Sequence, residues 1–417
     1  MQVTYRFLAA AIAASLVGAA AAQELRVVTY NASLNRTTAG ALIADLSTPH
    51  NVQAQKVAEI LQRLDADVVL INEFDYDAMG QAARLFRQNY LAVSQGGQRP
   101  LHYPHVFTAP SNTGVATGLD LDNNGYAFAT FAEYQAAVAA ANLPAFLAGV
   151  FYGNDSRGFG EFPGQYGMVV YSKYPILQNR VRTFRDFLWK DMPGALLPVD
   201  PVTQQPWYTS QELAVLPLSS KSHWDVPIRI DGRVVHVLAA HPTPPVFDGA
   251  EDRNGRRNHD EIRFWADYVT PFRGGYIRDD QGRRGGLGLL ERFVIVGDYN
   301  ADPLDGDSVA AAIDQLLANW LVDDCAPPTS AGGPEAALLQ GGANAGHRGD
   351  AALDTADFAD NAPGNLRVDY VLPSRLGLRH VNGAVFWPVL ADPLSLLVTA
   401  SDHRPVYADF RLTWLPW

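Results

Sequence analysis

The stretch at positions 292–303 constrains the fold of this chain more than any other. Its segment Phe293–Val296 is apolar and largely β-branched, with the length of a fully buried strand. A glycine follows, and Asp298 and Asn300 then stand two residues apart. If the extended geometry persists through Tyr299, the alternation of a strand places both polar side chains on one face. The alternative is an Asx turn that closes the strand.

The combination of a buried strand with a polar end recurs along the chain. The other residues in such positions are Asn31, Glu73, His241, Asp369, Asp402 and His403. Each of them alone would be ordinary at a strand end. Together they offer carboxylate and amide oxygens and imidazoles, without a thiolate, and hard oxygen ligands favour Mg²⁺, Mn²⁺ or Ca²⁺ over Zn²⁺. The pattern therefore predicts a metal-dependent site assembled from several strand ends.

Helices separate these strands in a way that is typical of an α/β fold. Asn51 can cap a helix over residues 52–64, whose apolar residues recur at i, i+3, i+4 and i+7. Strands are predicted on both sides of this helix, at 25–30 and 67–73. Two further strands form a hairpin around the turn Asp231–Gly232. No internal repeat or shift in composition indicates a second domain.

A short acidic loop resembles the start of a calcium-binding loop. Its oxygen-bearing side chains stand at alternate positions, namely Asp120, Asp122 and Asn124. Gly125 follows at the sixth position, but Phe131 occupies the twelfth, where an EF-hand has a glutamate. Asp155 could complete the ligand set from elsewhere in the chain. A structural Ca²⁺ site and a plain Asx-rich turn are both compatible with this pattern.

A charged segment precedes an amphipathic helix in the second half of the chain. Asn258 and Glu261 form a capping-box pattern that would open a helix ending near Val269. Arg253 and Arg257 precede that helix start, where they could hold a phosphate group. The alternative is a solvated helix start with internal ion pairs.

The first 22 residues are distinct from the fold. Arg6 supplies a positive charge, Phe7–Ala20 an apolar stretch and Ala20–Ala22 a small-residue cleavage site. This pattern predicts a signal peptide at 1–22, and hence a secreted or periplasmic protein. No later segment reaches the roughly 18 consecutive apolar residues of a membrane span, so we expect no transmembrane segment.

The composition limits both the sources of stability and the partners. Cys325 is the single cysteine, so an exported form would have no intrachain disulfide and would depend on its core and on bound ions. The 44 acidic residues outnumber the 32 basic ones. This balance argues against tight, sequence-independent binding of nucleic acid, which depends on neutralising phosphates with Lys and Arg. No Gly-x-Ser-x-Gly motif indicates a serine nucleophile, and no stable protein partner is indicated.

Five short motifs occur in a characteristic order. They are Thr29–Asn31, Asn72–Glu73, Gly297–Asn300, Arg367–Tyr370 and Ser401–His403. Together they resemble the endonuclease/exonuclease/phosphatase superfamily, which includes DNase I-like nucleases, sphingomyelinases and inositol polyphosphate phosphatases. The resemblance implies a four-layer α/β sandwich, in which helices flank two facing mixed β-sheets. It also implies one catalytic domain over residues 23–417, with insertions around 101–165 and 242–288. Asn72 departs mildly from the family pattern, where Gln is commoner.

The resemblance also implies how the site holds its metal. Asn31 and Glu73 would bind the divalent ion, which would be Mg²⁺, Mn²⁺ or Ca²⁺. Asp369 or Asp402 would assist through water. The metal would neutralise charge on the scissile phosphate and on the leaving oxygen.

The remaining motif residues would then act on the phosphate and the attacking water. Asp298 would orient or deprotonate the water, and Asn300 would donate a hydrogen bond to a phosphoryl oxygen. His403 would contact the phosphate, with its imidazole oriented by Asp369. His241 would donate a hydrogen bond or a proton from the other side. Hydrolysis would proceed in line without a covalent intermediate.

The expected function is thus that of a secreted, metal-dependent hydrolase of phosphoric esters, either a phosphodiesterase or a nuclease. A phosphomonoesterase or a phospholipase C-like enzyme of the sphingomyelinase type is the alternative within the same fold. The substrate could be nucleic acid, a phospholipid or a small phosphodiester. A non-catalytic binding module is a further alternative, although every motif position is filled.

Overall fold

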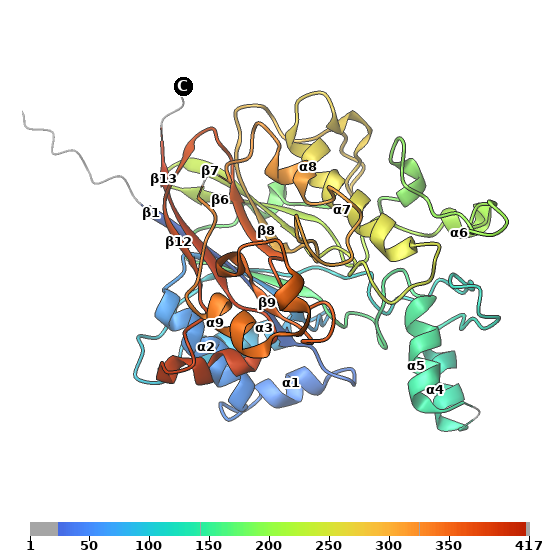
Figure 1. The fold of residues 1–417 in the computed structure, drawn as a ribbon, viewed down its shortest axis with the longest axis horizontal. Helices are drawn as coiled ribbons and strands as arrows, with labels where there is room; N and C mark the ends of the chain where they lie inside the picture. Colours follow the sequence, from blue (N-terminus) through green and yellow to red (C-terminus); the bar gives the residue numbers. More distant parts are fainter. Residues whose placement is uncertain (1–23, 142, 325, 414–417) are drawn as a thin grey trace, which may run out of the picture.

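The computed structural model describes residues 24–141, 143–324 and 326–413 (Figure 1). The predicted signal peptide at 1–22 and Cys325 lie outside the described residues. Across those ranges, no helix combines the length and apolar character that crossing a membrane requires.

One mixed sheet contains six strands in the order β12-β13-β1-β2-β4-β3. Their bounds are β1 Glu24–Leu34, β2 Val68–Phe74, β3 His105–Phe107, β4 Met168–Ser172, β12 Leu378–Val385 and β13 Val406–Leu412. β1 and β2 are parallel and are connected through α2 (Val52–Leu64), which has the bounds predicted from its apolar periodicity. The Asn51 side chain caps this helix by accepting a hydrogen bond from Ala54 N at 3.0 Å, as predicted.

A second mixed sheet contains five strands in the order β11-β8-β7-β6-β5. Their bounds are β5 Arg182–Thr183, β6 Trp224–Ile230, β7 Arg233–Ala240, β8 Arg292–Asp298 and β11 Asp369–Pro373. The predicted hairpin is confirmed, because β6 and β7 pair in an antiparallel register around Asp231–Gly232. β7 and β8 are parallel, and α7 (Arg253–Val269) lies between them in the chain.

Alternating side chains divide the core into layers. Leu25 and Val27 of β1 pack with Val294 and Val296 of β8 between the two sheets. The residues next to them in each strand face outward, where Val28 and Tyr30 pack with α2 and Phe293 and Ile295 pack with α7. Helices thus flank two facing sheets, and the predicted four-layer sandwich is confirmed (Figure 1).

The smaller elements lie outside these two sheets. The other helices are α1 Ala41–Leu46, α3 Gln81–Phe86, α4 Phe131–Ala139, α5 Ala145–Asn154, α6 Ser210–Leu213, α8 Asp314–Leu317 and α9 Gly332–Gln340. β9 (Ala356–Asp357) and β10 (Asn365–Leu366) form a two-stranded ribbon.

The two segments predicted as insertions have different structures. Within 101–165, β3 belongs to the six-stranded sheet, whereas α4 and α5 form a lobe that projects from the body (Figure 1). Within 242–288, α7 covers the five-stranded sheet and is therefore a layer of the fold. α7 ends at Val269 as predicted, but it begins at Arg253, five residues before the predicted capping box, so the predicted helix start was wrong.

Candidate active site

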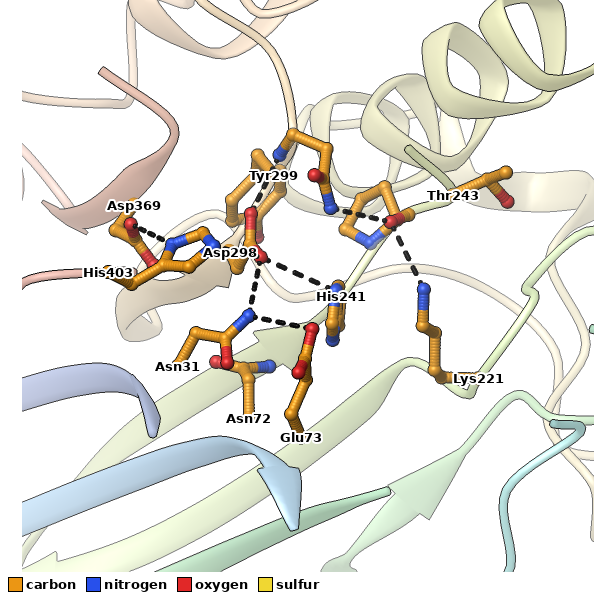
Figure 2. Close-up of polar contacts among 12 residues, drawn as sticks. Asn31, Asn72, Glu73, Lys221, His241, Thr243, Asp298, Tyr299, Asp369 and His403 are labelled. Carbon is orange, nitrogen blue, oxygen red and sulfur yellow. Dashed lines mark hydrogen bonds and ion pairs between the residues drawn. The ribbon is translucent and has the colours of Figure 1, made fainter. Parts of the chain in front are cut away.

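The strand ends that carry polar residues meet at one edge of the sandwich (Figure 2). Asp298 ends β8 and pairs with Asp369 at the start of β11. From the other sheet, Asn31 Nδ2 donates hydrogen bonds to Asp298 Oδ2 and to Glu73 Oε1, both at 3.0 Å. The Asn72 side chain bridges the sheets by donating to Ala240 O at 3.3 Å. Motifs far apart in the sequence therefore form one polar group.

The backbone around Asp298 leaves the strand abruptly. Gly297 has φ +150°, and a Cβ atom there would lie 2.0 Å from Ala240 O on the neighbouring strand, so the close approach requires glycine. Asn300 has φ 51°, and its N–H donates to Asp298 Oδ1 at 2.9 Å. The extended geometry does not persist through Tyr299, and the alternative Asx turn is the one observed. Asn300 Nδ2 donates to Pro242 O at 3.2 Å, which joins this turn to the next loop.

Glu73 also has a left-handed backbone, with φ 56°. Such a conformation costs a non-glycine residue about 1–3 kcal/mol and is concentrated at functional sites. Its carboxylate accepts hydrogen bonds from Asn31 at 3.0 Å and from Asn35 Nδ2 at 2.6 Å. Burial raises the pKa of Glu73, although the Asn31 hydrogen bond opposes the shift.

His403 and Asp369 form a buried charged pair. His403 Nδ1 lies 2.8 Å from Asp369 Oδ2, which also accepts a hydrogen bond from Thr355 Oγ1 at 2.9 Å. Burial lowers the pKa of His403, but the carboxylates of Asp369 and Asp298 outweigh that effect and raise it to about 10. The imidazole is therefore a cation at neutral pH, and its Nε2 lies 3.6 Å from Asp298 Oδ2.

Asp298 is the centre of the group. It is almost fully buried, and burial raises the pKa of its carboxyl to about 6, although the charge of His403 counteracts this shift. The carboxyl of Asp298 is therefore mostly ionised at neutral pH, yet it is a stronger base than the carboxylate of an exposed aspartate.

His241 follows β7 and approaches Asp298 from the opposite side, with Nε2 3.4 Å from Asp298 Oδ2. Its Nδ1 is buried and has no hydrogen-bond partner within the described part of the chain. Burial lowers the pKa of His241 far below its ordinary value, and the charges of Lys221 and His403 act in the same direction. His241 is therefore neutral, in contrast to His403.

Lys221 is a site residue that the sequence analysis missed. It is buried, and Nζ donates to Pro242 O at 3.4 Å, the oxygen that also accepts from Asn300 Nδ2. Lys221 lies on the same side of Asp298 as His241 (Figure 2). Burial lowers the pKa of Lys221, while the carboxylates of Glu261 and Asp298 oppose this shift. The hairpin supplied a signal, because the residues before β6 must lie at the same sheet edge as those after β7.

Two polar residues of α7 hold the loops of the site together. Glu261 is fully buried, and its carboxylate accepts hydrogen bonds from Ser220 N at 2.7 Å and Thr243 N at 2.6 Å. Asn258 Nδ2 donates to Thr243 O at 2.8 Å and Tyr299 O at 2.9 Å. The pair that the sequence suggested as a helix cap is thus an internal clamp on three loops.

The remaining predicted residues have other positions. Arg257 donates to the main-chain oxygens of Pro217 and Leu218, both at 2.9 Å, and Arg253 pairs with Glu251. Because these contacts direct both guanidinium groups to partners within the fold, the predicted phosphate role of the two arginines is not supported. Asp402 is exposed at the rim, where Oδ1 accepts a hydrogen bond from Ser33 Oγ at 3.3 Å.

The predicted calcium loop brings together a second carboxylate group. Oxygen atoms of Asp120, Asp122 and Asp155 lie within 4.8 Å of one another. Asn124 Oδ1 instead accepts a hydrogen bond from Tyr126 N at 2.8 Å, so this side chain closes the turn.

A family model for the endonuclease/exonuclease/phosphatase family matches residues 28–403. The chain belongs to this family. Members of the endonuclease/exonuclease/phosphatase family are in general hydrolases of phosphoric esters and typically use a divalent metal. No curated protein matches the chain.

Several solved structures are similar to this family member, all at low sequence identity. An endonuclease/exonuclease/phosphatase from Beutenbergia cavernae is 17% identical, with a TM-score of 0.46, and the match covers 93% of this chain and 72% of that one. Sphingomyelinase C from Streptomyces griseocarneus is 15% identical, with a TM-score of 0.43 and coverages of 93% and 99%. TDP2 from Caenorhabditis elegans is 13% identical, with a TM-score of 0.43 and coverages of 93% and 74%.

Two sets of residues near Asp298 could hold the metal that the family uses. Asp298, Asp369 and His403 offer atoms within 4.8 Å of one another, but the charged His403 is already hydrogen-bonded to Asp369. Glu73 fits a cation better, because its carboxylate has only the amides of Asn31 and Asn35 as described hydrogen-bond partners. Rotation of the Asn31 amide would add a second oxygen ligand. The donor chemistry suits a hard divalent ion.

Proposed function

We propose that this member of the family hydrolyses phosphodiesters with a divalent metal and an in-line attack by water. The observation that carries the proposal is the position of Asp298. Its buried carboxylate lies between a charged imidazole, that of His403, and a neutral one, that of His241. This arrangement supplies a base and a cation within one small group of residues.

Asp298 would accept the proton of the attacking water. Its pKa of about 6 suits a general base that works near neutral pH. Asn300 would donate a hydrogen bond to a phosphoryl oxygen after its amide leaves Pro242 O, which is 3.2 Å away. Asn300 N also donates a hydrogen bond to Asp298 Oδ1, so the same turn positions both the general base and the residue that would contact the phosphate.

Two fixed basic side chains would stabilise the negative charge that develops on the phosphoryl oxygens. His403 is kept charged by Asp369, and Lys221 uses one described hydrogen bond, to Pro242 O, of the three that an ammonium can donate. Such preorganised charges in a buried site stabilise a transition state without reorganisation. His241 would donate a hydrogen bond from the other side of the phosphate.

Glu73 and Asn31 would hold the metal, with Asp402 assisting through water at the exposed rim. A bound divalent cation supplies charge neutralisation at the scissile phosphate and the leaving oxygen. The residues of the chain then position the water, the base and the phosphate around it.

The charge of the site favours a diester over a monoester. Carboxyl groups outnumber the basic side chains of the site: Glu73, Glu261, Asp298 and Asp369 face His403 and Lys221. A phosphodiester brings one negative charge into this surrounding, whereas a phosphomonoester dianion brings two. Monoester hydrolysis is therefore the less favoured alternative, whereas sphingomyelin is itself a phosphodiester and remains an alternative substrate within the proposed class.

We also propose that the catalytic unit spans residues 23–417 and is secreted or periplasmic. The signal-peptide pattern at 1–22 supports this location.

A substrate panel tests the proposed class. The full chain would be assayed with bis(p-nitrophenyl) phosphate, p-nitrophenyl phosphate, plasmid DNA and sphingomyelin in Mg²⁺, Mn²⁺ or Ca²⁺. We expect kcat/KM for the small diester to exceed that for the monoester. A higher value for the monoester would contradict the charge argument, and no turnover of any ester would favour a binding module.

A further inference from the structure

The geometry points to a second cation site, separate from the active site. We propose that Asp120, Asp122 and Asp155 bind a structural Ca²⁺ ion at the base of the lobe formed by α4 and α5. This inference does not depend on the proposed phosphodiesterase activity.

The three carboxylates come from two segments that the fold brings together. Asp120 and Asp122 belong to the loop before α4, and Asp155 follows the last residue of α5. Their oxygens lie within 4.8 Å of one another. Gly125 has φ +85° and donates its N–H to Asp120 Oδ2 at 2.8 Å, so the loop folds back around its own carboxylate. The loop thus presents converging anionic groups.

Asp155 supplies an independent indication that a ligand is involved. It is only 1% exposed, and its Oδ1 accepts a hydrogen bond from Leu121 N at 2.7 Å. Its other oxygen, Oδ2, is buried and has no hydrogen-bond partner among the residues that the structure describes. A buried carboxylate oxygen without a partner is expensive, and it lies in a residue that faces two further carboxylates. A bound cation would satisfy that oxygen and remove the repulsion.

The chain itself provides no cation for this group within the described residues. The one side-chain donor described for Asp122 is the neutral amide of Asn154, which reaches Oδ2 at 2.7 Å. Asp120 accepts hydrogen bonds only from main-chain N–H groups, those of Asn124 and Gly125. Ca²⁺ suits such an irregular set of oxygens better than Mg²⁺, which requires near-octahedral geometry.

The position of the site explains what a bound ion would stabilise. The lobe has a small aromatic core of its own around Phe128 and Tyr152. Leu121, between two of the carboxylates, instead packs in the core beside the five-stranded sheet, and Trp207 Nε1 donates to Leu121 O at 3.0 Å. An ion here would therefore fasten the lobe to the body of the protein.

Melting temperature provides a readout that does not depend on activity. The measurements would use Glu73→Ala, which removes a ligand of the active-site metal, first in EDTA and then in millimolar CaCl₂. A ligand that binds only the folded form raises its stability, so we expect an increase of roughly 3 °C or more. Adding Asp155→Asn or Asp122→Asn should abolish that increase, and an equal concentration of MgCl₂ should produce a smaller one.

Asp360→Asn in the same background is the matched control, since Asp360 is exposed and lies outside both carboxylate groups. It should retain the whole increase. The proposal would be overturned if Glu73→Ala abolished the Ca²⁺ response, or if the response survived in both lobe variants. Asp122→Asn keeps the test decisive if Asp155→Asn fails to fold.

Terbium luminescence locates the ion independently. Tb³⁺ replaces Ca²⁺ and is excited by a nearby indole, here that of Trp207. In the Glu73→Ala background, Trp207→Phe should lower the sensitised emission severalfold, whereas Trp320→Phe, which changes an exposed indole, should not. Equal emission from both variants would overturn the assignment of the ion to this loop.

Discussion

The molecule contains two groups of converging carboxylates, and their charges are balanced in different ways. Around Asp298, the chain supplies the charged imidazole of His403 and the amine of Lys221, which are buried with the carboxylates. Around Asp122, the described contacts are main-chain N–H groups and the amide of Asn154. The first group therefore has basic side chains beside its carboxylates, whereas we propose that the second takes its countercharge from an ion in solution.

This difference explains why only the first group suits catalysis. A fixed cation beside a base can stabilise a developing negative charge, because it is already oriented and desolvated. The loop at the base of the lobe offers anions alone, so it can hold a cation but has nothing with which to bind a phosphate. We therefore expect substitutions in the first group to change turnover and those in the second to change stability.

The largest expected effect is that of Asp298→Asn. The amide cannot accept a proton, and general bases contribute about 10²–10⁴-fold, so we expect kcat for bis(p-nitrophenyl) phosphate to fall by about 10³-fold. Circular dichroism should show an unchanged fold. A loss below tenfold would mean that another residue is the base, and Asp360→Asn serves as the charge-matched control.

Lys221→Met should have the next largest effect. It removes a buried amine from the proposed phosphate site, and we expect kcat/KM to decrease by roughly 10²-fold. Lys190→Met provides the control, because Lys190 is exposed. If the two variants had equal kinetics, Lys221 would have only a structural role. That result would contradict the view that the basic side chains around Asp298 act on the substrate.

Glu261→Gln tests whether the clamp on α7 positions the site. The new amide would present an N–H to Ser220 N or Thr243 N, both of which now donate to this carboxylate. We expect kcat/KM to fall by roughly tenfold, as is typical for residues that orient the ligands of a site. Unchanged kinetics with a lowered melting temperature would show that the clamp contributes only to stability.

The smallest expected effect concerns His236, a buried histidine that pairs with Asp225 away from the active site. Burial lowers the pKa of His236, but Asp225, 2.6 Å away, and Glu291 outweigh it and raise it to about 9. The folded pKa exceeds the unfolded one, so the stabilisation is complete below about pH 6.5 and is lost as pH rises through about 9.

Urea unfolding of the wild type and of His236→Gln would reveal this dependence. The difference in free energy of unfolding should be largest near pH 6 and should shrink towards pH 9, whereas exposed His50→Gln should show no such trend. A difference that grows with pH would contradict the expectation that the carboxylates of Asp225 and Glu291 stabilise the charged form of His236.

The sequence predicted the parts of this molecule that depend on local periodicity. The bounds of α2 follow from an apolar period of 3.6, the hairpin from the Asp231–Gly232 turn between two apolar segments, and the strand before Asp298 from a continuous apolar run. The polar residues at strand ends were also predicted to form one site, and they converge because Asn31, Glu73, His241 and Asp298 lie at the carboxyl ends of their strands or directly after them, while Asp369 and His403 come from the starts of antiparallel strands.

The missed features depend on tertiary contacts. Lys221 and Glu261 are buried polar residues whose partners lie in other loops, so no local pattern distinguishes them from surface residues. Asn258 and Glu261 fit a capping box by spacing, yet α7 begins earlier and turns both inward. The left-handed turn at Asn300 is likewise set by its bonds to Asp298 and Pro242.

Metal removal is the decisive test of the proposed diester hydrolysis. The wild-type chain would be treated with EDTA, assayed with bis(p-nitrophenyl) phosphate, and assayed again after addition of excess Mg²⁺, Mn²⁺ or Ca²⁺. We predict that turnover is lost in EDTA and restored by at least one of the ions, and that none restores it in Asp298→Asn. Equal rates with and without the chelator would contradict the proposed mechanism.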